Sequence, residues 1–119
     1  MKLLLHWKRV PPSTPLRSHL ERRLEFSLGR FAPRIRQVRA LLADDNGDRG
    51  GLDKSCRLEV RCGGDLLRVT GRDRYLNTAI DSACDRMHRT LARLVDRQHF
   101  QNSGRWRVEG LLRRRHATH

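Results

Sequence analysis

The residues with the clearest chemical potential are arginines repeated at helical spacing. At about 100° per residue, four of them fall within roughly 80° of one another around a helix. We call them the arginine row: Arg86, Arg89, Arg93 and Arg97. A guanidinium group is planar and permanently charged, and its paired N–H bonds match the oxygens of a phosphate. The row therefore predicts contact with a polyanion, and nucleic acid is the first candidate.

The same helix has an apolar side that would anchor it in a core. Its members are Leu76, Ile80, Ala83, Met87, Leu91 and Leu94. Asp85 stands four residues before Arg89, which predicts an ion pair, but such surface pairs contribute only about 0.3 to 0.5 kcal/mol. We therefore expect the row to keep its positive potential.

The overall charge favours the same class of partner. The 119 residues contain 26 Lys plus Arg against 13 Asp plus Glu, a formal net charge of +13, and almost all of the excess is arginine. Such a charge opposes compaction unless a partner neutralises it. Aromatic residues make up only 5% of the chain, so we expect recognition of RNA shape and backbone rather than base stacking.

No spacing typical of a metal or catalytic site is present among the cysteines and histidines. Three cysteines are too few for a zinc site, and the odd number argues against a disulfide framework; they are Cys56, Cys62 and Cys84. No apolar stretch has membrane-spanning length. We therefore expect a cytoplasmic protein without cofactor, metal, small-molecule substrate or enzymatic activity, and with no membrane partner.

The first half of the chain predicts a strand, a helix and a second strand. Alternation from Met1 to Arg9 is typical of a strand. Ser13 or Thr14, followed by Pro15, predicts a helix start. The helix itself is indicated by a leucine every fourth residue, and Gly29 would end it; the repeat is Leu16, Leu20, Leu24 and Leu28. Period-two alternation returns over residues 35–43.

The second half predicts a hairpin and the long helix. Residues 44–54 contain three glycines and four aspartates, which is typical of a loop. Strands follow over residues 56–62 and 66–72, joined by a tight turn at Gly63, Gly64 and Asp65. The fold class is thus α+β, in the order β-α-β-β-β-α, with a four-stranded sheet and two helices packed on one face.

We predict one folded domain over residues 1–98 and a basic, flexible tail over residues 99–119. Apolar periodicity fades after about Gln98, and the remainder holds five arginines and one glutamate. The tail arginines are candidates for additional, nonspecific RNA contacts; they include Arg113, Arg114 and Arg115.

These residues resemble a known family, the ribosome hibernation promoting factors and ribosome-associated translation inhibitors. The resemblance rests on the order of elements and on two segments, Thr78 to Asp81 and Asp85 to Arg93. Arg86, Arg89 and Arg93 match the basic positions of the family's second helix. Leu16, Arg17 and Arg23 fit its first helix. Asn77, Met87 and Thr90 depart from the usual tyrosine, leucine and glutamine.

The resemblance implies a factor that binds the small ribosomal subunit in the channel for mRNA and tRNA and blocks translation by occupancy. The RNA-binding candidates on the first helix are then Arg22 and Arg23, in addition to the arginine row. The chain lacks the C-terminal dimerisation domain of the long family members, so we expect it to be monomeric when free.

Two other binding modes remain open, and an enzyme is the last alternative. A double-stranded RNA-binding domain shares the α-β-β-β-α order and would bind isolated duplex RNA. A protein-interaction module could use an open sheet edge and would respond little to salt. A small nuclease would need clustered carboxylates, which the loop supplies only weakly; they are Asp44, Asp45, Asp48 and Asp53.

Overall fold

The computed structural model describes the backbone of residues 2–45 and 53–112 and the side chains as far as Gln98. It divides into two compact units, Met1–Arg89 and Thr90–His119. The elements are β1 (Lys2–Lys8), α1 (Thr14–Leu28), the 3₁₀ helix η1 (Gly29–Arg34), β2 (Ile35–Asp44), β3 (Lys54–Cys62), β4 (Asp65–Asp73) and α2 (Leu76–Leu112). The order β-α-β-β-β-α is confirmed.

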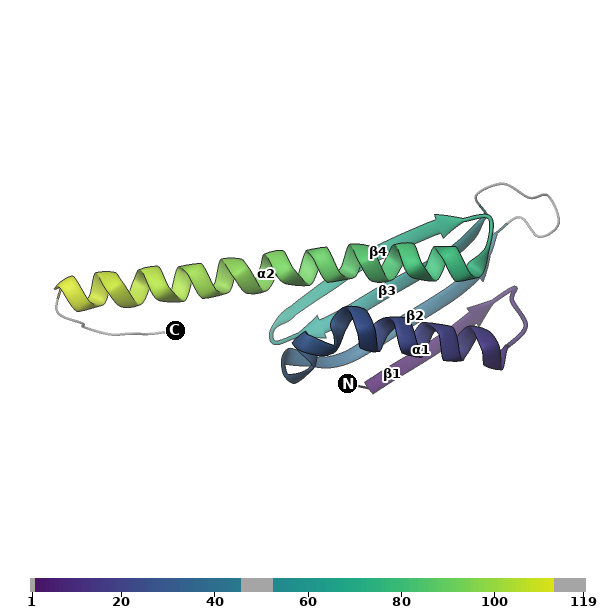
Figure 1. The fold of residues 1–119 in the computed structure, drawn as a ribbon, viewed down its shortest axis with the longest axis horizontal. Coiled ribbons are helices and arrows are strands. Elements are labelled where there is room, and N and C mark those ends of the chain that lie inside the picture. Colours follow the sequence, from purple (N-terminus) through teal and green to yellow (C-terminus); the bar gives the residue numbers. More distant parts are fainter. Residues whose placement is uncertain (1, 46–52, 113–119) are drawn as a thin grey trace. The chain divides into compact units, whose positions relative to one another are not determined.

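The four strands form one mixed sheet in the order β1-β2-β3-β4. β1 runs parallel to β2, and the other neighbours are antiparallel. In the first unit, α1 and α2 cover the same face of this sheet (Figure 1). The strand register aligns a row of apolar residues across that face: Leu5 pairs with Ala40, Ala40 with Leu58, and Leu58 with Val69. Side chains on the other face point away from both helices.

The first helix begins where the sequence predicts. Ser13 has an extended backbone, and its hydroxyl accepts a hydrogen bond from the Leu16 backbone nitrogen at 3.3 Å, which satisfies one unpaired donor of the first turn. At the other end, Gly29 keeps helical dihedral angles, and the chain continues directly into η1. The sequence did not reveal η1, because this short segment has no helical periodicity and contains Gly29 and Pro33, which favour a turn or loop.

The predicted leucine repeat and the apolar side of α2 supply the core. Leu20, Leu24 and Leu28 are at most 2% exposed, while Leu16 is only partly buried. From α2, Ile80 and Met87 are completely buried. The anchoring of the second helix by its apolar side is therefore confirmed within the first unit. In the continuation, Leu91 and Leu94 are also buried.

The hairpin and the close approach of α2 depend on two glycines. Gly63 has φ +60° in the turn between β3 and β4, a conformation that glycine adopts without a steric cost. Gly71 on β4 faces the backbone of α2: a Cβ built there would lie 2.6 Å from the Ala83 nitrogen and closer still to the Ala79 carbonyl oxygen. The glycine therefore allows the helix to pack directly on the strand.

The second helix is longer than the sequence indicates. A tail was predicted from residue 99, yet α2 remains helical to Leu112. The tail arginines Arg113, Arg114 and Arg115 lie outside the described residues. No helix in the described part of the chain is long and apolar enough to span a membrane.

The three cysteines are buried thiols. Burial raises the pKa of the Cys84 thiol to about 12 and also raises the pKa of Cys56 and of Cys62. Because the thiolate is the reactive form, all three should react slowly with iodoacetamide at pH 8 in the native protein. We expect rapid modification of all three in guanidinium chloride, measured by mass spectrometry. Fast labelling of one cysteine under native conditions would contradict its burial.

Candidate nucleic-acid interface

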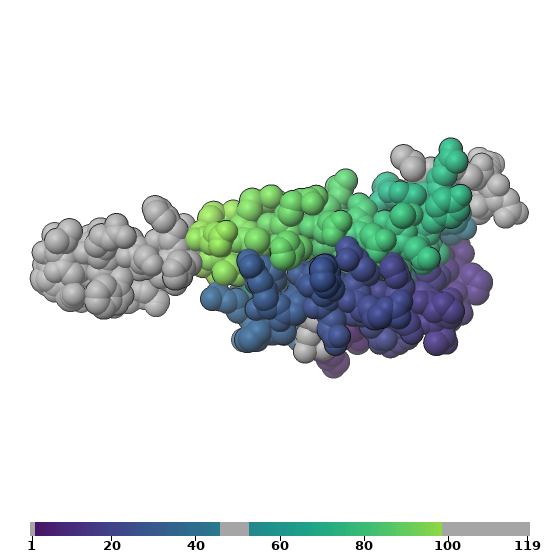
Figure 2. Space-filling view, viewed as in Figure 1, coloured from purple at the N-terminus to yellow at the C-terminus, as the bar shows by residue number. Residues whose placement is uncertain are grey.

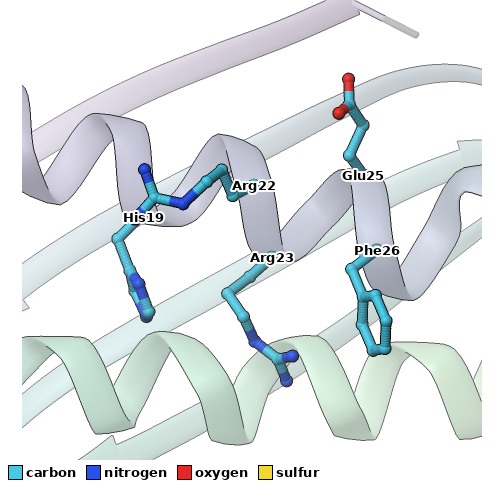
Figure 3. A pocket seen from close by; sticks show the side chains of 5 residues that line it. All are labelled: His19, Arg22, Arg23, Glu25 and Phe26. Carbon is cyan, nitrogen blue, oxygen red and sulfur yellow. The ribbon is translucent and has the colours of Figure 1, made fainter.

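A charged network joins α1 to α2 within the first unit, where the two helices lie side by side at the surface (Figure 2). His19 donates from Nε2 to the Asp81 Oδ1 at 2.8 Å. The Arg23 Nε lies 3.0 Å from the same oxygen, as an ion pair without the alignment of a hydrogen bond. Arg23 also donates from Nη2 to Asp85 Oδ1 at 2.8 Å. His19 and Arg23 point from α1 toward α2 in Figure 3. The network fixes one helix against the other.

The network changes what can be expected of Arg23 and Asp85. The sequence placed Arg23 among the RNA-binding candidates, but its guanidinium contacts two carboxylates and its side chain is only 25% exposed. The predicted pair between Asp85 and Arg89 is wrong, because Asp85 pairs with Arg23, 62 residues earlier in the chain. Arg23 therefore aligns the two helices. Arg89 makes no ion pair with Asp85, so its charge is available to another partner.

The other candidates on the two helices are exposed. Arg22 lies on α1 beside the network, and Arg86 and Arg89 lie on α2. Within the described residues, no carboxylate lies at ion-pair distance from Arg22 or Arg89, whereas Arg86 makes an interaction within the protein. In the second unit, Arg93 and Arg97 are exposed on the continuing helix. All four members of the arginine row thus reach solvent.

A hollow between the helices contains an aromatic residue that the sequence analysis missed. It is lined by Phe26, Ser27, Asp85, His88 and Arg89. Phe26 is 80% exposed, and the Arg23 guanidinium lies 5.7 Å from the centre of its ring, within the range of a cation–π contact. Its position in the sequence could have indicated this exposure. Phe26 lies about 200° around the helix from Leu24, which belongs to the apolar leucine repeat.

His88 also lines this hollow. Its Nδ1 donates to the Ser27 carbonyl oxygen at 2.6 Å, and its ring lies 5.6 Å from the ring of Phe31 in a tilted arrangement. These contacts hold α2 against the end of α1, because Ser27 and Phe31 flank the junction with η1. His88 therefore positions the neighbouring Arg89, which is exposed.

The loop carboxylates that a nuclease would need are engaged by basic side chains. Lys54 Nζ lies 3.3 Å from both Asp44 Oδ1 and Asp53 Oδ2, and Asp45 contacts Arg72 at 3.5 Å. Asp48 lies outside the described residues. Among those that the structure does describe, no group of three or more histidine, cysteine or acidic residues could hold a metal ion. The described geometry offers no support for the nuclease alternative.

Comparison with known proteins identifies a family that matches most of the chain. A family model described as "Sigma 54 modulation protein / S30EA ribosomal protein" matches residues 4–99. No curated protein sequence shows a significant match.

Two solved structures are similar in fold. A ribosomal subunit interface protein from Coxiella burnetii superposes with a TM-score of 0.69 at 15% identity, covering 81% of this chain and 99% of that one. The N-terminal domain of Protein Y from Thermus thermophilus gives a TM-score of 0.63 at 21% identity, covering 79% of this chain and 99% of that domain. At these identities the two structures support the fold alone.

Proposed function

Because this chain belongs to the Sigma 54 modulation protein / S30EA ribosomal protein family, a family of ribosome-associated hibernation factors, we propose that it binds the small ribosomal subunit in the channel for mRNA and tRNA. It would inhibit translation there by occupying the channel, in the cytoplasm and without a cofactor. In this proposal no bond is made or broken, and the activity consists of steric exclusion.

The observation that carries the proposal is the exposed cationic surface on two helices that are locked together. Arg22 comes from α1, and Arg86 and Arg89 come from α2. Arg23 bridges to both Asp81 and Asp85 on α2, so the helices present their arginines in a fixed arrangement. Fixed guanidinium groups suit a folded RNA, whose phosphates also have fixed positions.

The energetics of such docking favour RNA over a neutral partner. Each phosphate that a basic side chain neutralises releases condensed counterions, which lowers log K by about 0.7 to 0.9 per decade of salt. Arg86 and Arg89 would supply such contacts from the first unit, and Arg93 and Arg97 would supply others from the second. Arg113, Arg114 and Arg115 would add nonspecific attraction.

Phe26 would add a base-stacking contact, which the charged side chains do not supply. An exposed aromatic ring next to a guanidinium provides a face on which an unpaired base can stack, as single-stranded parts of folded RNA are commonly recognised. The low aromatic content of the chain, 5%, favours little base stacking overall. One well-placed ring is sufficient for a single base, so we propose Phe26 as a contact within the same site.

Gradient sedimentation tests the proposal directly. The protein is mixed with purified small and large ribosomal subunits at moderate salt, and its position in the gradient is followed by immunoblotting. We expect it to migrate with small subunits, to leave them as salt is raised, and to compete with mRNA and initiator tRNA.

Three results would contradict the proposal. Protein that remains at the top of the gradient at moderate salt would rule out stable binding to the ribosome. Equal affinity for an isolated RNA duplex would instead favour the double-stranded RNA-binding mode. Association that is insensitive to salt would point to the sheet edge as a protein-interaction surface.

A further inference from the structure

The sheet face that points away from the helices is strongly basic. No helix of the first unit covers it, since α1 and α2 both lie on the opposite face (Figure 1). The strand register places the following cations on this face: Lys2, Lys8, Arg39, Arg57, Arg61, Arg68 and Arg72. All of them are exposed. Two of these cations contact carboxylates: Arg68 contacts Glu59 at 2.8 Å, and Arg72 contacts Asp45 at 3.5 Å.

A hollow lies near the centre of this face. It is lined by His6, Arg39, Leu41, Arg57 and Glu59, which come from β1, β2 and β3. Its volume of about 260 Å³ is below the roughly 300 to 1,000 Å³ that is usual for small-molecule sites. The hollow therefore suits a small charged group of a larger partner better than a separate organic ligand.

The register explains how two guanidinium groups converge on this hollow. Arg39 is opposite Glu59 on the neighbouring strand, and Arg57 is opposite Leu41. Arg39 and Arg57 are thus diagonal neighbours, with Cβ atoms about 7 to 8 Å apart. No ion pair to either of them occurs among the described residues, and Glu59 is occupied by Arg68. The net potential in the hollow is positive.

We propose that this face is a second RNA-binding surface, in which Arg39 and Arg57, with His6 at the rim, hold a backbone phosphate. The inference rests on the proposed function, because it adds a second RNA contact to the one made by the helices. A sheet has two faces, so the protein would touch RNA on opposite sides. It would then bind in a cleft between two RNA segments rather than on an open RNA surface.

RNA is favoured over an acidic protein by the composition of the face. Apolar side chains are few and lie apart: Leu4 and Leu41 are partly buried, and Leu66 is 51% exposed at the opposite edge of the sheet. Protein–protein interfaces usually have an apolar or aromatic centre surrounded by a polar rim. Here the centre is occupied by arginine, which is typical of contact with a phosphate backbone.

The test compares two double variants of the full chain. Arg39→Gln with Arg57→Gln removes the charges at the hollow, and Arg34→Gln with Arg74→Gln removes two exposed arginines outside both proposed surfaces. The affinity for purified small subunits is measured at several salt concentrations. We expect the hollow variant to bind at least tenfold more weakly and to reduce the slope of log K against log salt by about 0.7 to 0.9, the value for one phosphate. The control variant should match the wild type in its affinity and in its salt dependence.

The outcomes separate this inference from the proposed function. If the hollow variant keeps the affinity and slope of the wild type while the protein still binds small subunits, the second surface is wrong and the function stands. If the wild type does not bind at all, the proposed function fails first. Weaker binding with an unchanged slope would also overturn the inference, because phosphate neutralisation must alter the slope.

A second measurement identifies the class of partner. Leu41 lines the hollow, so a photoreactive benzoylphenylalanine at that position would report what lies against it. We expect irradiation of the subunit complex to link the protein to rRNA. A link to a ribosomal protein would overturn the RNA assignment of this face, as would the absence of any link when the same probe at Phe26 gives one.

Discussion

We expect the variant with Arg86→Ala, Arg89→Ala and Arg93→Ala to lose most of its affinity for small ribosomal subunits. These side chains are exposed on α2, and a hydrogen bond from a charged group contributes about 1.5 to 3 kcal/mol. Three lost contacts should therefore weaken binding by about a thousandfold or more. The slope of log K against log salt should fall by about 2 to 3, because up to three phosphates are no longer neutralised.

The variant should remain folded, which makes the loss of binding interpretable. Alanine has the highest helix propensity, and the apolar side of α2, including Ile80 and Met87, is untouched. Circular dichroism and a denaturant titration would verify this. A charge-matched control removes three other exposed arginines, Arg34, Arg36 and Arg74. Equal losses in both variants would mean that total charge, rather than the arginine row, determines binding.

The periodic elements could be predicted because their signals are local. A leucine every fourth residue predicts α1, and alternation from Cys56 to Cys62 predicts β3. The N-cap at Ser13 follows from a local rule as well. The strand ends were less accurate: β3 begins at Lys54, opposite Asp73, because pairing with β4 extends the strand into polar residues that carry no apolar alternation.

The parts of the site that the sequence missed depend on contacts distant in the chain. Arg23 reads as an exposed basic residue flanked by other charges, but its partner Asp85 is 62 residues away. The same applies to the sheet face: Arg39 and Arg57 become neighbours only through the register of β2 and β3. Residue types thus predicted a basic, RNA-binding protein, while pairing between elements determines which arginines are available.

The sequence did not predict the C-terminal extension of α2, and the reason is different from the one for the site residues. Residues 99–112 lack apolar periodicity, so the sequence predicted a tail, yet the backbone stays helical to Leu112. The segment contains Gly104 and Gly110 but no proline. A glycine inside a helix costs only about 1 kcal/mol relative to alanine, and propagation from an existing helix costs much less than nucleation. The absence of proline is therefore as informative as the presence of an apolar side.

The substitution Gly71→Ala should destabilise the fold more than any surface change. The added Cβ would meet the α2 backbone at the Ala83 nitrogen, 2.6 Å away, and at the Ala79 carbonyl oxygen. Neither atom can move without shifting the helix from the sheet. Overpacking of this kind costs about 1 to 3 kcal/mol and occasionally more, so the midpoint of chemical denaturation should fall clearly.

Gly64→Ala is the matched control for this prediction. Gly64 lies in the turn beside Gly63, and a Cβ there meets nothing within 4 Å; alanine at such a site lowers the entropy of the unfolded chain and is neutral or stabilising by up to about 1 kcal/mol. Gly71→Ala should therefore lower the midpoint of denaturation, whereas Gly64→Ala should leave it unchanged or raise it. An unchanged midpoint for Gly71→Ala would mean that α2 does not pack closely on β4. The fixed alignment of Arg86 and Arg89 with α1 would then lose its support, because the same helix carries them and the carboxylates of Asp81 and Asp85 that bind Arg23.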